Sequence, residues 1–347
     1  MSRVFIIAEA GVNHNGDVDL ARQLIKIARD CGADAVKFQT FRAQDLVTID
    51  APAAEYQTRN AGVTTQFDML KKLELPEAWH YLLKDYADSL NIEFFSTPFS
   101  EAAIDLLTHV GVKRIKLSSG ELTNRPLLRH AAATGLPLIL STGMGTLTEV
   151  ESAVAWISDA YEKSSGSSMP SSHLSLMHCT SNYPASSETL NLNAITTLAR
   201  VLGLPVGYSD HSLGATAAIA AVALGAMVIE KHITFDKRAP GPDHPASCDA
   251  AEFAEYVIAV RKTSLMLGDG IKAPNAQEMN TLSVARRSVV ASRSLQQGHL
   301  LGQNDLVLRR PSGGIEPAAL ELLLGRRLLK SISSGEKLVW DNLEAET

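Results

Sequence analysis

Short β-branched or aromatic runs alternate with longer amphipathic segments through about the first 267 residues of the chain. The runs predict strands at residues 4–9, 35–39, 93–97, 114–118, 138–141, 174–180, 205–210 and 227–232. Amphipathic helices are expected between them, at residues 17–31, 76–91, 124–134, 146–161, 191–200, 215–224 and 249–267. Residues that favour the helix N-cap position support this division, namely Asp17, Ser100, Asn124 and Asp249.

Eight strands, each followed by a helix, are typical of a (β/α)8 TIM barrel, an α/β fold. An open doubly wound sheet is the alternative, because alternation of strands and helices does not prove that the sheet closes. No G-x-G-x-x-G motif follows the first strand, which disfavours the dinucleotide-binding form of that alternative.

The segment Leu267-Gly268-Asp269-Gly270 ends the last helix of this series, and Pro274 follows it. We therefore predict a barrel domain at residues 1–270, a linker at 271–284 and a small domain at 285–347. Short strands and turns are expected in the small domain, at residues 288–291, 306–309, 325 and 337–340. This domain is too small for a large core, so we expect it to dock on the barrel or on another subunit. The Ser-rich residues 164–172 predict a solvated loop.

Charge and cysteine content exclude several classes of partner. The chain has 347 residues and a formal net charge of −6, so no global basic field attracts nucleic acid or an anionic membrane. Its three cysteines lack a metal-binding spacing and are typical of a reducing compartment. The longest apolar stretch, residues 215–229, is shorter than the roughly 20 residues that span a bilayer. We expect a soluble, cytoplasmic protein without a secretory signal.

Polar residues gather where each predicted strand ends. The loops of a barrel converge at the carboxyl ends of its strands, so these side chains are expected to share one cavity. Polar groups in buried strands carry a desolvation cost unless they are paired, so chance does not explain their repeated occurrence at the strand ends. The strand-end residues considered are Glu9, Lys37, Gln39, Thr97, Lys116, Ser119, Glu121, Ser141, Thr180, Ser209, His211, Glu230 and His232.

Three subsets of these residues suggest three kinds of chemistry. Lys37 and Lys116, with nearby hydroxyls, suit a phosphate or carboxylate, although each lysine can also be a structural partner of Glu9 or Glu121. His211 and His232 end neighbouring strands and form an incomplete ligand set, which leaves open positions on a metal such as Mn²⁺. The alternative is that both are hydrogen-bonded core histidines.

The carboxylates Glu9, Glu121 and Asp243 are candidates for proton transfer and for binding hydroxyl groups. Asp243 lies in the loop Ala239-Pro240-Gly241-Pro242-Asp243-His244, just past the eighth predicted strand. Its Pro and Gly residues stiffen the loop, which would hold Asp243 over the cavity, but an ordinary Pro/Gly turn would look the same.

The sequence resembles the sialic acid synthase family, which includes N-acetylneuraminate and legionaminic acid synthases. The tail looks like the antifreeze-like (SAF) domain of that family, with RRP at residues 309–311 and LLG at 323–325. The blocks that match the barrel are IAEAGVNHNG at 7–16, VKFQT at 36–40, FSTPF at 95–99, SSGE at 118–121, LSTGM at 140–144, HCT at 178–180, GYSDH at 207–211, IEKH at 229–232 and PGPDH at 240–244.

The resemblance implies a condensation of phosphoenolpyruvate with an N-acylated amino sugar that depends on Mn²⁺, with Mg²⁺ and Co²⁺ as substitutes. His211 and His232 would bind the metal, and Glu9 would position or deprotonate the attacking water. A domain-swapped homodimer is implied, in which Arg310 caps the site of the partner. Phosphoenolpyruvate would contact Lys37, Thr97, Lys116, Ser119, Ser141, Ser181, Tyr183 and Ser209. The sugar would contact Gln39, Glu121, Tyr183, Asp243 and Arg310.

Two positions depart from the family pattern. Ser181 stands where some members have Asn, and Ser312-Gly313 replaces the usual x-Asn of the tail. The PGPDH block argues against the pseudaminic acid branch of the family.

We predict an N-acetylneuraminate synthase that uses N-acetylmannosamine. The alternative is a legionaminic acid synthase that uses 2,4-diacetamido-2,4,6-trideoxymannose. Different classes are a metal aldolase, another phosphoenolpyruvate condenser, and a non-enzymatic carbohydrate-binding module.

Overall fold

The computed structural model describes residues 3–51 and 65–345, and it divides into two compact units, Met1–Asp269 and Gly270–Thr347. Each unit has a hydrophobic core of its own. Within the described residues, none of the helices combines the length and the apolar character that crossing a membrane requires.

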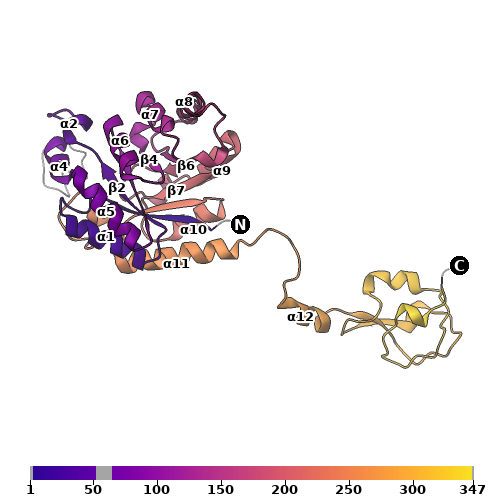
Figure 1. The fold of residues 1–347 in the computed structure, drawn as a ribbon. Helices are drawn as coiled ribbons and strands as arrows, with labels where there is room; N and C mark the ends of the chain where they lie inside the picture. Colours follow the sequence, from indigo (N-terminus) through magenta and orange to yellow (C-terminus); the bar gives the residue numbers. More distant parts are fainter. Residues whose placement is uncertain (1–2, 52–64, 346–347) are drawn as a thin grey trace. The chain divides into compact units, whose positions relative to one another are not determined.

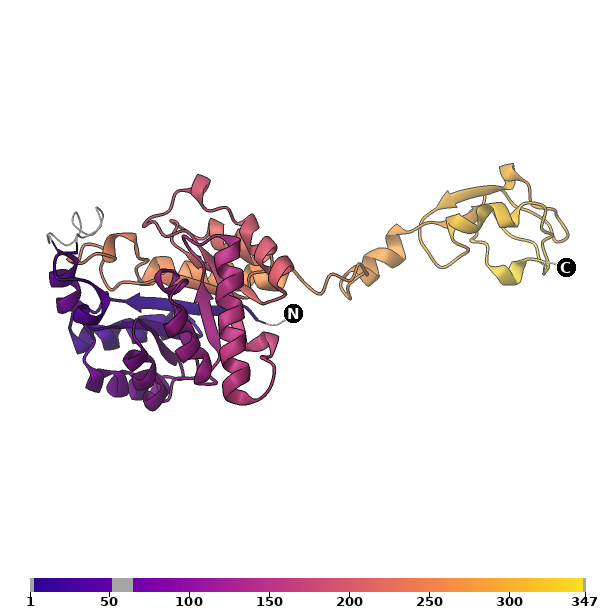
Figure 2. The same ribbon diagram turned by 90° about the horizontal axis from the view of Figure 1, so that it is seen from above.

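Unit 1 is built around eight parallel strands that form a nearly closed barrel (Figures 1 and 2). Hydrogen bonds join them in the order β3-β2-β1-β8-β7-β6-β5-β4, and β3 and β4 contact each other where the ladder ends. Because β1 pairs with β8 and the two ends of the ladder, β3 and β4, are also in contact, the strands form a ring, so the barrel prediction is confirmed and the open sheet is excluded. The strands are β1 Phe5–Gly11, β2 Ala35–Thr40, β3 Glu93–Pro98, β4 Ile115–Leu117, β5 Leu138–Ser141, β6 Leu174–Cys179, β7 Val206–Asp210 and β8 Val228–His232.

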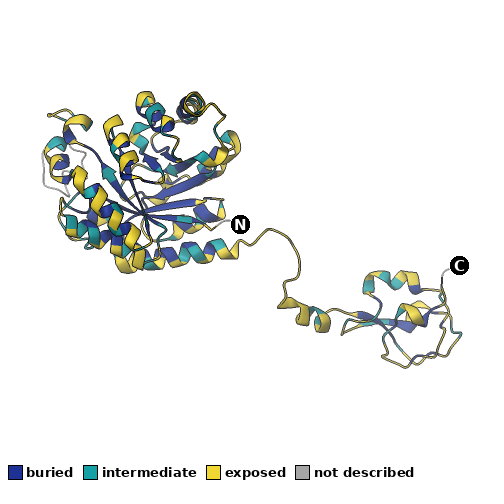
Figure 3. Cartoon of the chain, in the orientation of Figure 1, coloured by how far each residue is buried: buried dark blue, intermediate teal, exposed yellow. Residues whose placement is uncertain are grey.

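Helices cover the outside of the barrel, with buried faces toward the strands and exposed faces toward solvent (Figure 3). The predicted N-caps are confirmed: Asp17, Ser100, Asn124 and Asp249 each accept a hydrogen bond from a backbone amide of the first turn. Helices α2, α4 and α6 were not predicted from the sequence, although Ser100 was expected as an N-cap. The helices are α1 Val18–Asp30, α2 Ala43–Leu46, α4 Gln66–Leu73, α5 Glu77–Ser89, α6 Glu101–Val110, α7 Arg125–Ala133, α8 Leu147–Ser165, α9 Asn193–Leu202, α10 Thr216–Ala223 and α11 Ala250–Met266.

Unit 2 contains a two-stranded antiparallel sheet of β9 Ser288–Ala291 and β10 Leu306–Arg309, as expected from the sequence. Residues 337–340, expected to form a short strand or a turn, contain a bridge between Lys337 and Val290, and a 3-10 turn at Trp340–Asn342 follows it. The stretch 271–284 is not wholly irregular, because helix α12 Glu278–Ala285 lies largely within it and buries none of its residues.

A polar network outside the barrel ties β7 and β8 to α11. Lys231 Nζ lies 3.2 Å from Asp210 Oδ2 and also donates to the carbonyl of Ser212. Tyr256 of α11 donates to the same carboxylate oxygen at 2.9 Å, and Ser212 donates to the other oxygen at 2.6 Å. Because Asp210 is fully buried, these partners replace the water that it loses on folding.

Removing the Tyr256 hydroxyl tests this network. Tyr256→Phe leaves Asp210 Oδ2 without one of its donors, so we expect the barrel to lose about 1.5–3 kcal/mol of unfolding free energy. Urea unfolding followed by circular dichroism measures this loss. Tyr81→Phe, which changes a surface tyrosine, is the matched control and should stay within about 0.5 kcal/mol of the wild type. Equal effects of the two substitutions would contradict the assignment.

Candidate active site

A cavity of about 250 Å³ opens at the carboxyl ends of the barrel strands. It gathers every residue that was given a catalytic, metal-binding or substrate-binding role except Glu121 and Arg310, and the strand-end residue Thr180 does not line it either. Side chains far apart in the sequence therefore converge at the strand ends of the barrel. The predicted residues that line it are Glu9, Lys37, Gln39, Thr97, Lys116, Ser119, Ser141, Ser181, Tyr183, Ser209, His211, His232 and Asp243.

Four buried charges lie on the floor of the cavity. Lys37 Nζ lies 2.8 Å from Glu9 Oε2 and 3.7 Å from Glu230 Oε2, and it donates to Thr97 Oγ1 at 2.9 Å. Lys116 Nζ lies 3.4 Å from the same Glu230 oxygen. The two lysines therefore share one carboxylate. The structural partner of Lys116 is Glu230, and not Glu121 as one alternative suggested.

The pKa values of this cluster follow from burial and from pairing. Burial lowers the pKa of Lys116, and Glu230 only partly opposes that effect. Burial acts on Lys37 too, but Glu230 and Glu9 outweigh it and raise the Lys37 pKa. Burial would raise the Glu230 pKa, but the two lysines hold it well below its ordinary value. Burial raises the pKa of Glu9 to about 7. The cluster therefore keeps both lysines near an anion-sized space while Glu9 exchanges protons near neutral pH.

Hydroxyl groups extend this anion-binding side of the cavity. Ser209 Oγ donates to Glu230 Oε1 at 2.9 Å. Ser119 Oγ accepts from the backbone amide of Gly143 at 3.0 Å and lies 3.2 Å from Cys179 Sγ. A Cβ atom on Gly143 would come within 2.5 Å of Ser181 Oγ, so only glycine lets these side chains approach the loop so closely.

Two neutral imidazoles stand beside the charged cluster. The rings of His211 and His232 have centroids 5.7 Å apart. His211 Nδ1 donates to the carbonyl of Thr180 at 2.6 Å, which leaves Nε2 as the acceptor for Tyr183, whose hydroxyl is 3.0 Å away. Burial lowers the His211 pKa to about 4 and lowers the His232 pKa well below its ordinary value, so both rings are uncharged at neutral pH.

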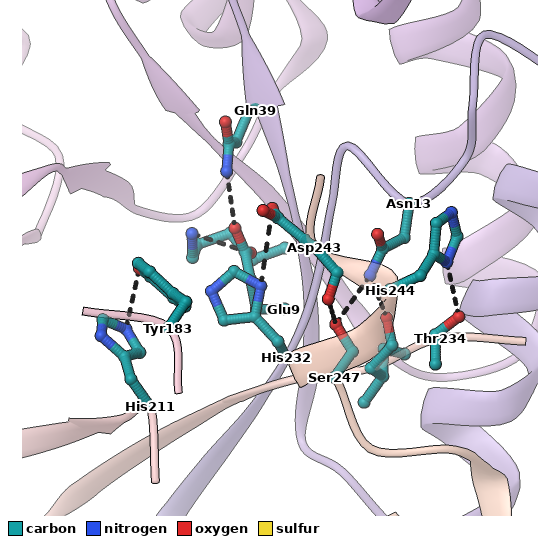
Figure 4. A network of polar contacts seen from close by, with 12 residues as sticks. Glu9, Asn13, Gln39, Tyr183, His211, His232, Thr234, Asp243, His244 and Ser247 are labelled. Atoms are coloured by element: carbon teal, nitrogen blue, oxygen red, sulfur yellow. Dashed lines mark hydrogen bonds and ion pairs between the residues drawn. The ribbon is translucent and has the colours of Figure 1, made fainter. Parts of the chain in front are cut away.

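These two rings fit a metal with an incomplete protein ligand set. Metal-binding histidines usually donate their second ring nitrogen to a carbonyl or carboxylate, as His211 does. His232 Nδ1 is buried without a hydrogen-bond partner, and a carboxylate oxygen of Asp243 lies 4.0 Å away (Figure 4). No group of three metal-ligating side chains is found among residues 3–51 and 65–345. An ion held by two histidines would have further positions for water and substrate.

The loop that carries Asp243 is anchored by buried side chains (Figure 4). Ser247 Oγ donates to the Asp243 carbonyl at 2.7 Å and accepts from Asn13 Nδ2 at 2.9 Å. His244 Nδ1 pairs with Thr234 Oγ1 at 2.7 Å. The loop is therefore more than an ordinary Pro/Gly turn, because it holds Asp243 at the cavity. Burial raises the pKa of Asp243 to about 6.

The remaining predicted sugar-binding residues differ in their surroundings. Gln39 Nε2 donates to Glu9 Oε1 at 3.2 Å, as Figure 4 shows, so it orients the carboxylate as well as lining the cavity. Glu121 accepts from Asn124 at 2.6 Å and is not among the cavity-lining residues. Arg310 belongs to unit 2, where it is exposed.

Glu230 was expected at the cavity as a strand-end residue, but the sequence did not give it a chemical role, and it gave none to Cys179 or to the apolar lining residues. The period-2 alternation of a strand contained the signal for Glu230. His232 was placed at the cavity, and a residue two positions earlier in the same strand faces the same way. The same alternation would place the Cys179 side chain at the cavity, but only once the bounds of β6 are known.

An eight-stranded barrel whose strand ends converge on one polar cavity, with a small second unit, defines an enzyme of the barrel class. The model of the NeuB family matches residues 24–272, and that of the SAF domain matches residues 286–344. The chain therefore belongs to the NeuB family and carries a SAF domain at its C-terminal end.

Similar proteins cover nearly the whole chain. An N,N'-diacetyllegionaminic acid synthase of Legionella pneumophila is 50% identical over 98% of this chain and 95% of its own length. The N,N'-diacetyllegionaminic acid synthase of Campylobacter jejuni is 41% identical over 97% of this chain and 99% of its own. A crystal structure of N-acetylneuraminic acid synthetase from Leptospira borgpetersenii, in complex with citrate, is 36% identical. It has a TM-score of 0.69 and covers 81% of this chain and 90% of that one.

The position of Glu230 between two lysines predicts a large stability effect. Glu230→Gln leaves Lys116 buried without a countercharge, so we expect a loss of about 3–5 kcal/mol in urea unfolding at pH 7. Glu121→Gln, outside the cavity, is the control and should change stability by less than about 0.5 kcal/mol.

A second variant shows whether the stability loss of Glu230→Gln comes from the unpaired lysine or from altered packing. The double variant Glu230→Gln/Lys116→Met removes both charges, so it should be more stable than Glu230→Gln alone. If the double variant lost more stability than the single one, the cost would lie in packing and not in the unpaired lysine.

Proposed function

We propose that this enzyme condenses phosphoenolpyruvate with an open-chain N-acylated amino sugar and water, and releases a nonulosonate and inorganic phosphate. The observation that carries this proposal is the meeting of Lys37, Lys116, His211 and His232 around one cavity of about 250 Å³. Two cations suit a small dense anion, and two neutral imidazoles suit a Lewis-acidic metal. Membership of the NeuB family supports the same reaction.

Phosphoenolpyruvate would bind where the lysines and hydroxyls meet. Lys37 and Lys116 would contact its phosphate and carboxylate, and Thr97 would keep Lys37 in place through its 2.9 Å hydrogen bond. The hydroxyls that complete the contacts are those of Ser119, Ser141, Ser181, Tyr183 and Ser209. Lys116 has a lowered pKa and only one shared carboxylate, so an arriving anion would stabilise its charged form.

His211 and His232 would hold the metal, for which we propose Mn²⁺, with Mg²⁺ and Co²⁺ as substitutes. When bound, the ion supplies Lewis acidity that polarises the aldehyde of the sugar. Gln39, Tyr183 and Asp243 would orient the sugar so that its aldehyde carbon meets C3 of phosphoenolpyruvate.

Glu9 would hold or accept a proton of the attacking water. In the proposed sequence the C2–C3 double bond of phosphoenolpyruvate breaks as C3 bonds to the aldehyde carbon, the aldehyde oxygen takes a proton from solvent, and C2 becomes an oxocarbenium centre. Water adds at C2 and gives one proton to Glu9. The C2–O bond to phosphate then breaks, the C2 hydroxyl becomes the carbonyl, and its proton leaves with the phosphate. Glu9 is suited to accept the proton of that water because burial raises its pKa to about 7, which lets the carboxyl group exchange protons near neutral pH. Gln39 fixes the orientation of the carboxylate through Oε1.

For the sugar we propose 2,4-diacetamido-2,4,6-trideoxymannose, which makes the product N,N'-diacetyllegionaminate. Two relatives that carry this activity in their names are 50% and 41% identical over nearly the whole chain. The solved N-acetylneuraminic acid synthetase is 36% identical over 81% of it. This choice replaces the N-acetylmannosamine predicted from the sequence, because that prediction weighed motifs that both kinds of synthase share.

We further propose that the protein acts as a homodimer in the cytoplasm, with Arg310 as a sugar-binding residue. The family resemblance of the tail supports the dimer and the role of Arg310. The three cysteines, none of them in a disulfide, support a reducing compartment. The proposed reaction is tested by offering the two sugars separately and measuring the phosphate released from phosphoenolpyruvate. If neither sugar supported phosphate release, the proposal would be overturned.

The raised pKa of Glu9 predicts the acid side of the pH profile. The active form of a base exists above its pKa, so kcat/KM should fall about tenfold per unit as the pH drops below about 7. His211, with a pKa near 4, stays neutral over most of this range, so its protonation does not produce the same loss. Glu9→Gln should lower kcat about 10²–10⁴-fold. Its residual activity should not show the fall near pH 7, and a retained fall would contradict the role of Glu9.

The metal site makes an independent prediction. His211→Ala and His232→Ala each remove one of two protein ligands, so we expect Mn²⁺ binding measured by calorimetry to weaken at least about 100-fold, with loss of phosphate release. His109→Ala, at an exposed position on α6, is the control and should bind Mn²⁺ like the wild type. Unchanged Mn²⁺ binding in both cavity variants would place the metal elsewhere.

A further inference from the structure

The cavity has a lining that the proposed chemistry does not use. Beside the charged and hydroxyl groups the lining includes the apolar residues Val12, Met69, Leu70, Leu73, Phe99, Met144 and Pro242. The first five of these pack in one hydrophobic cluster. The polar lining comes mainly from strand ends. The clustered apolar lining comes from helix α4 and from residues just after β1 and β3. A sugar held between these two surfaces would make hydrogen bonds on one side and apolar contacts on the other.

Helix α4 turns one face toward this lining. Met69, Leu70 and Leu73 are buried, whereas Lys71 and Lys72 on the same helix are exposed. This pattern is that of an amphipathic helix, whose apolar stripe normally packs wholly against protein. Here the stripe packs in a cluster separate from the barrel core and also borders the cavity.

The backbone of α4 is held independently of these side chains. Glu74, just past the helix, accepts a hydrogen bond from the amide of Ala43 at 2.8 Å. A Cβ atom on Gly16 would come within 2.7 Å of the carbonyl of Lys72, so the loop after β1 packs tightly against the last turn. Thr65 caps the first turn by accepting from the amide of Asp68 at 3.2 Å. A substitution on the apolar face therefore leaves the anchors of the helix intact.

An apolar surface discriminates between sugars in a predictable direction. A hydroxyl placed against it loses hydrogen bonds to water, whereas a methyl group gains by leaving water. The diacetamido trideoxy sugar has a methyl at C6 and a second acetyl methyl at N4. N-acetylmannosamine has hydroxyls at both positions. One methyl group in such a pocket is worth about 10–200-fold in kcat/KM.

We infer that Met69, Leu70 and Leu73 form the specificity-determining surface of this enzyme, which contacts the methyl groups of a deoxy, doubly N-acylated sugar. The inference rests on the proposed function, which it deepens by naming the residues that select the substrate. These side chains are apart from the lysines and hydroxyls assigned to phosphoenolpyruvate, so we expect them to act on sugar selection and to leave the binding of phosphoenolpyruvate unchanged.

Near-isosteric polar substitutions test this inference. In Leu70→Asn and Met69→Gln the ratio of kcat/KM for the trideoxy sugar to that for N-acetylmannosamine should fall about tenfold or more. The fall should arise mostly from a higher KM for the trideoxy sugar, with the KM for phosphoenolpyruvate unchanged. The ratio does not depend on the fraction of active enzyme, so partial unfolding of a variant does not mimic the effect. Lys72→Gln, on the exposed face of α4, is the matched control and should keep the wild-type ratio.

The outcomes separate this inference from the proposed function. A wild type that released no phosphate with either sugar would overturn the proposed function and the inference together. A wild type that prefers N-acetylmannosamine would overturn the proposed sugar, and the apolar selection with it. A wild type that prefers the trideoxy sugar, with a ratio unchanged in both Leu70→Asn and Met69→Gln, would overturn the inference alone.

Discussion

Four charges buried at one end of the barrel, Glu9, Lys37, Lys116 and Glu230, constrain the rest of the site. Removing an ion from water costs several kcal/mol, so each charge needs a partner that the fold must deliver. Strand register supplies the first pair, because Glu9 of β1 lies opposite Lys37 of β2. Closure of the barrel supplies the rest, since it brings Lys116 of β4 to Glu230 of β8, 114 residues further along the chain.

The cluster is more weakly paired than a purely structural one. Lys37 has carboxylates on two residues, but Lys116 lies 3.4 Å from an oxygen that it shares with Lys37. Burial lowers the Lys116 pKa because Glu230 opposes it only in part, and burial raises the Glu9 pKa although Lys37 opposes it. Groups whose pKa values are shifted in a cleft are typical of functional sites, because stability alone would favour full pairing. An anion that binds both lysines would complete the pairing, so substrate binding and the folding of this region depend on the same charges.

Much of this arrangement could be predicted from the sequence, because a barrel places strand ends together regardless of detail. The lysines, the two histidines and the loop of Asp243 were predicted from that rule alone. The partner of Lys116 was not, since it depends on which strands meet across the barrel. The apolar face of α4 was also missed, because an amphipathic stripe at Met69 and Leu70 looks the same whether it borders a core or a cavity. Only the packing of distant segments distinguishes the two.

Strands β7 and β8 show how the barrel carries such a site. Their register places Ser209 beside Glu230 and Asp210 beside Lys231. Alternation turns the first pair toward the cavity and the second toward α11, where Tyr256 and Ser212 complete the hydrogen bonds of Asp210. The outer pair is thus fully satisfied, while the inner cluster keeps a lysine with incomplete pairing. The ion pair of Asp210 and Lys231 on the outer face holds the backbone of β7 and β8 in place. Glu230 on the inner face is therefore positioned by the fold, and the charged cluster around it can keep shifted pKa values without loosening the strands.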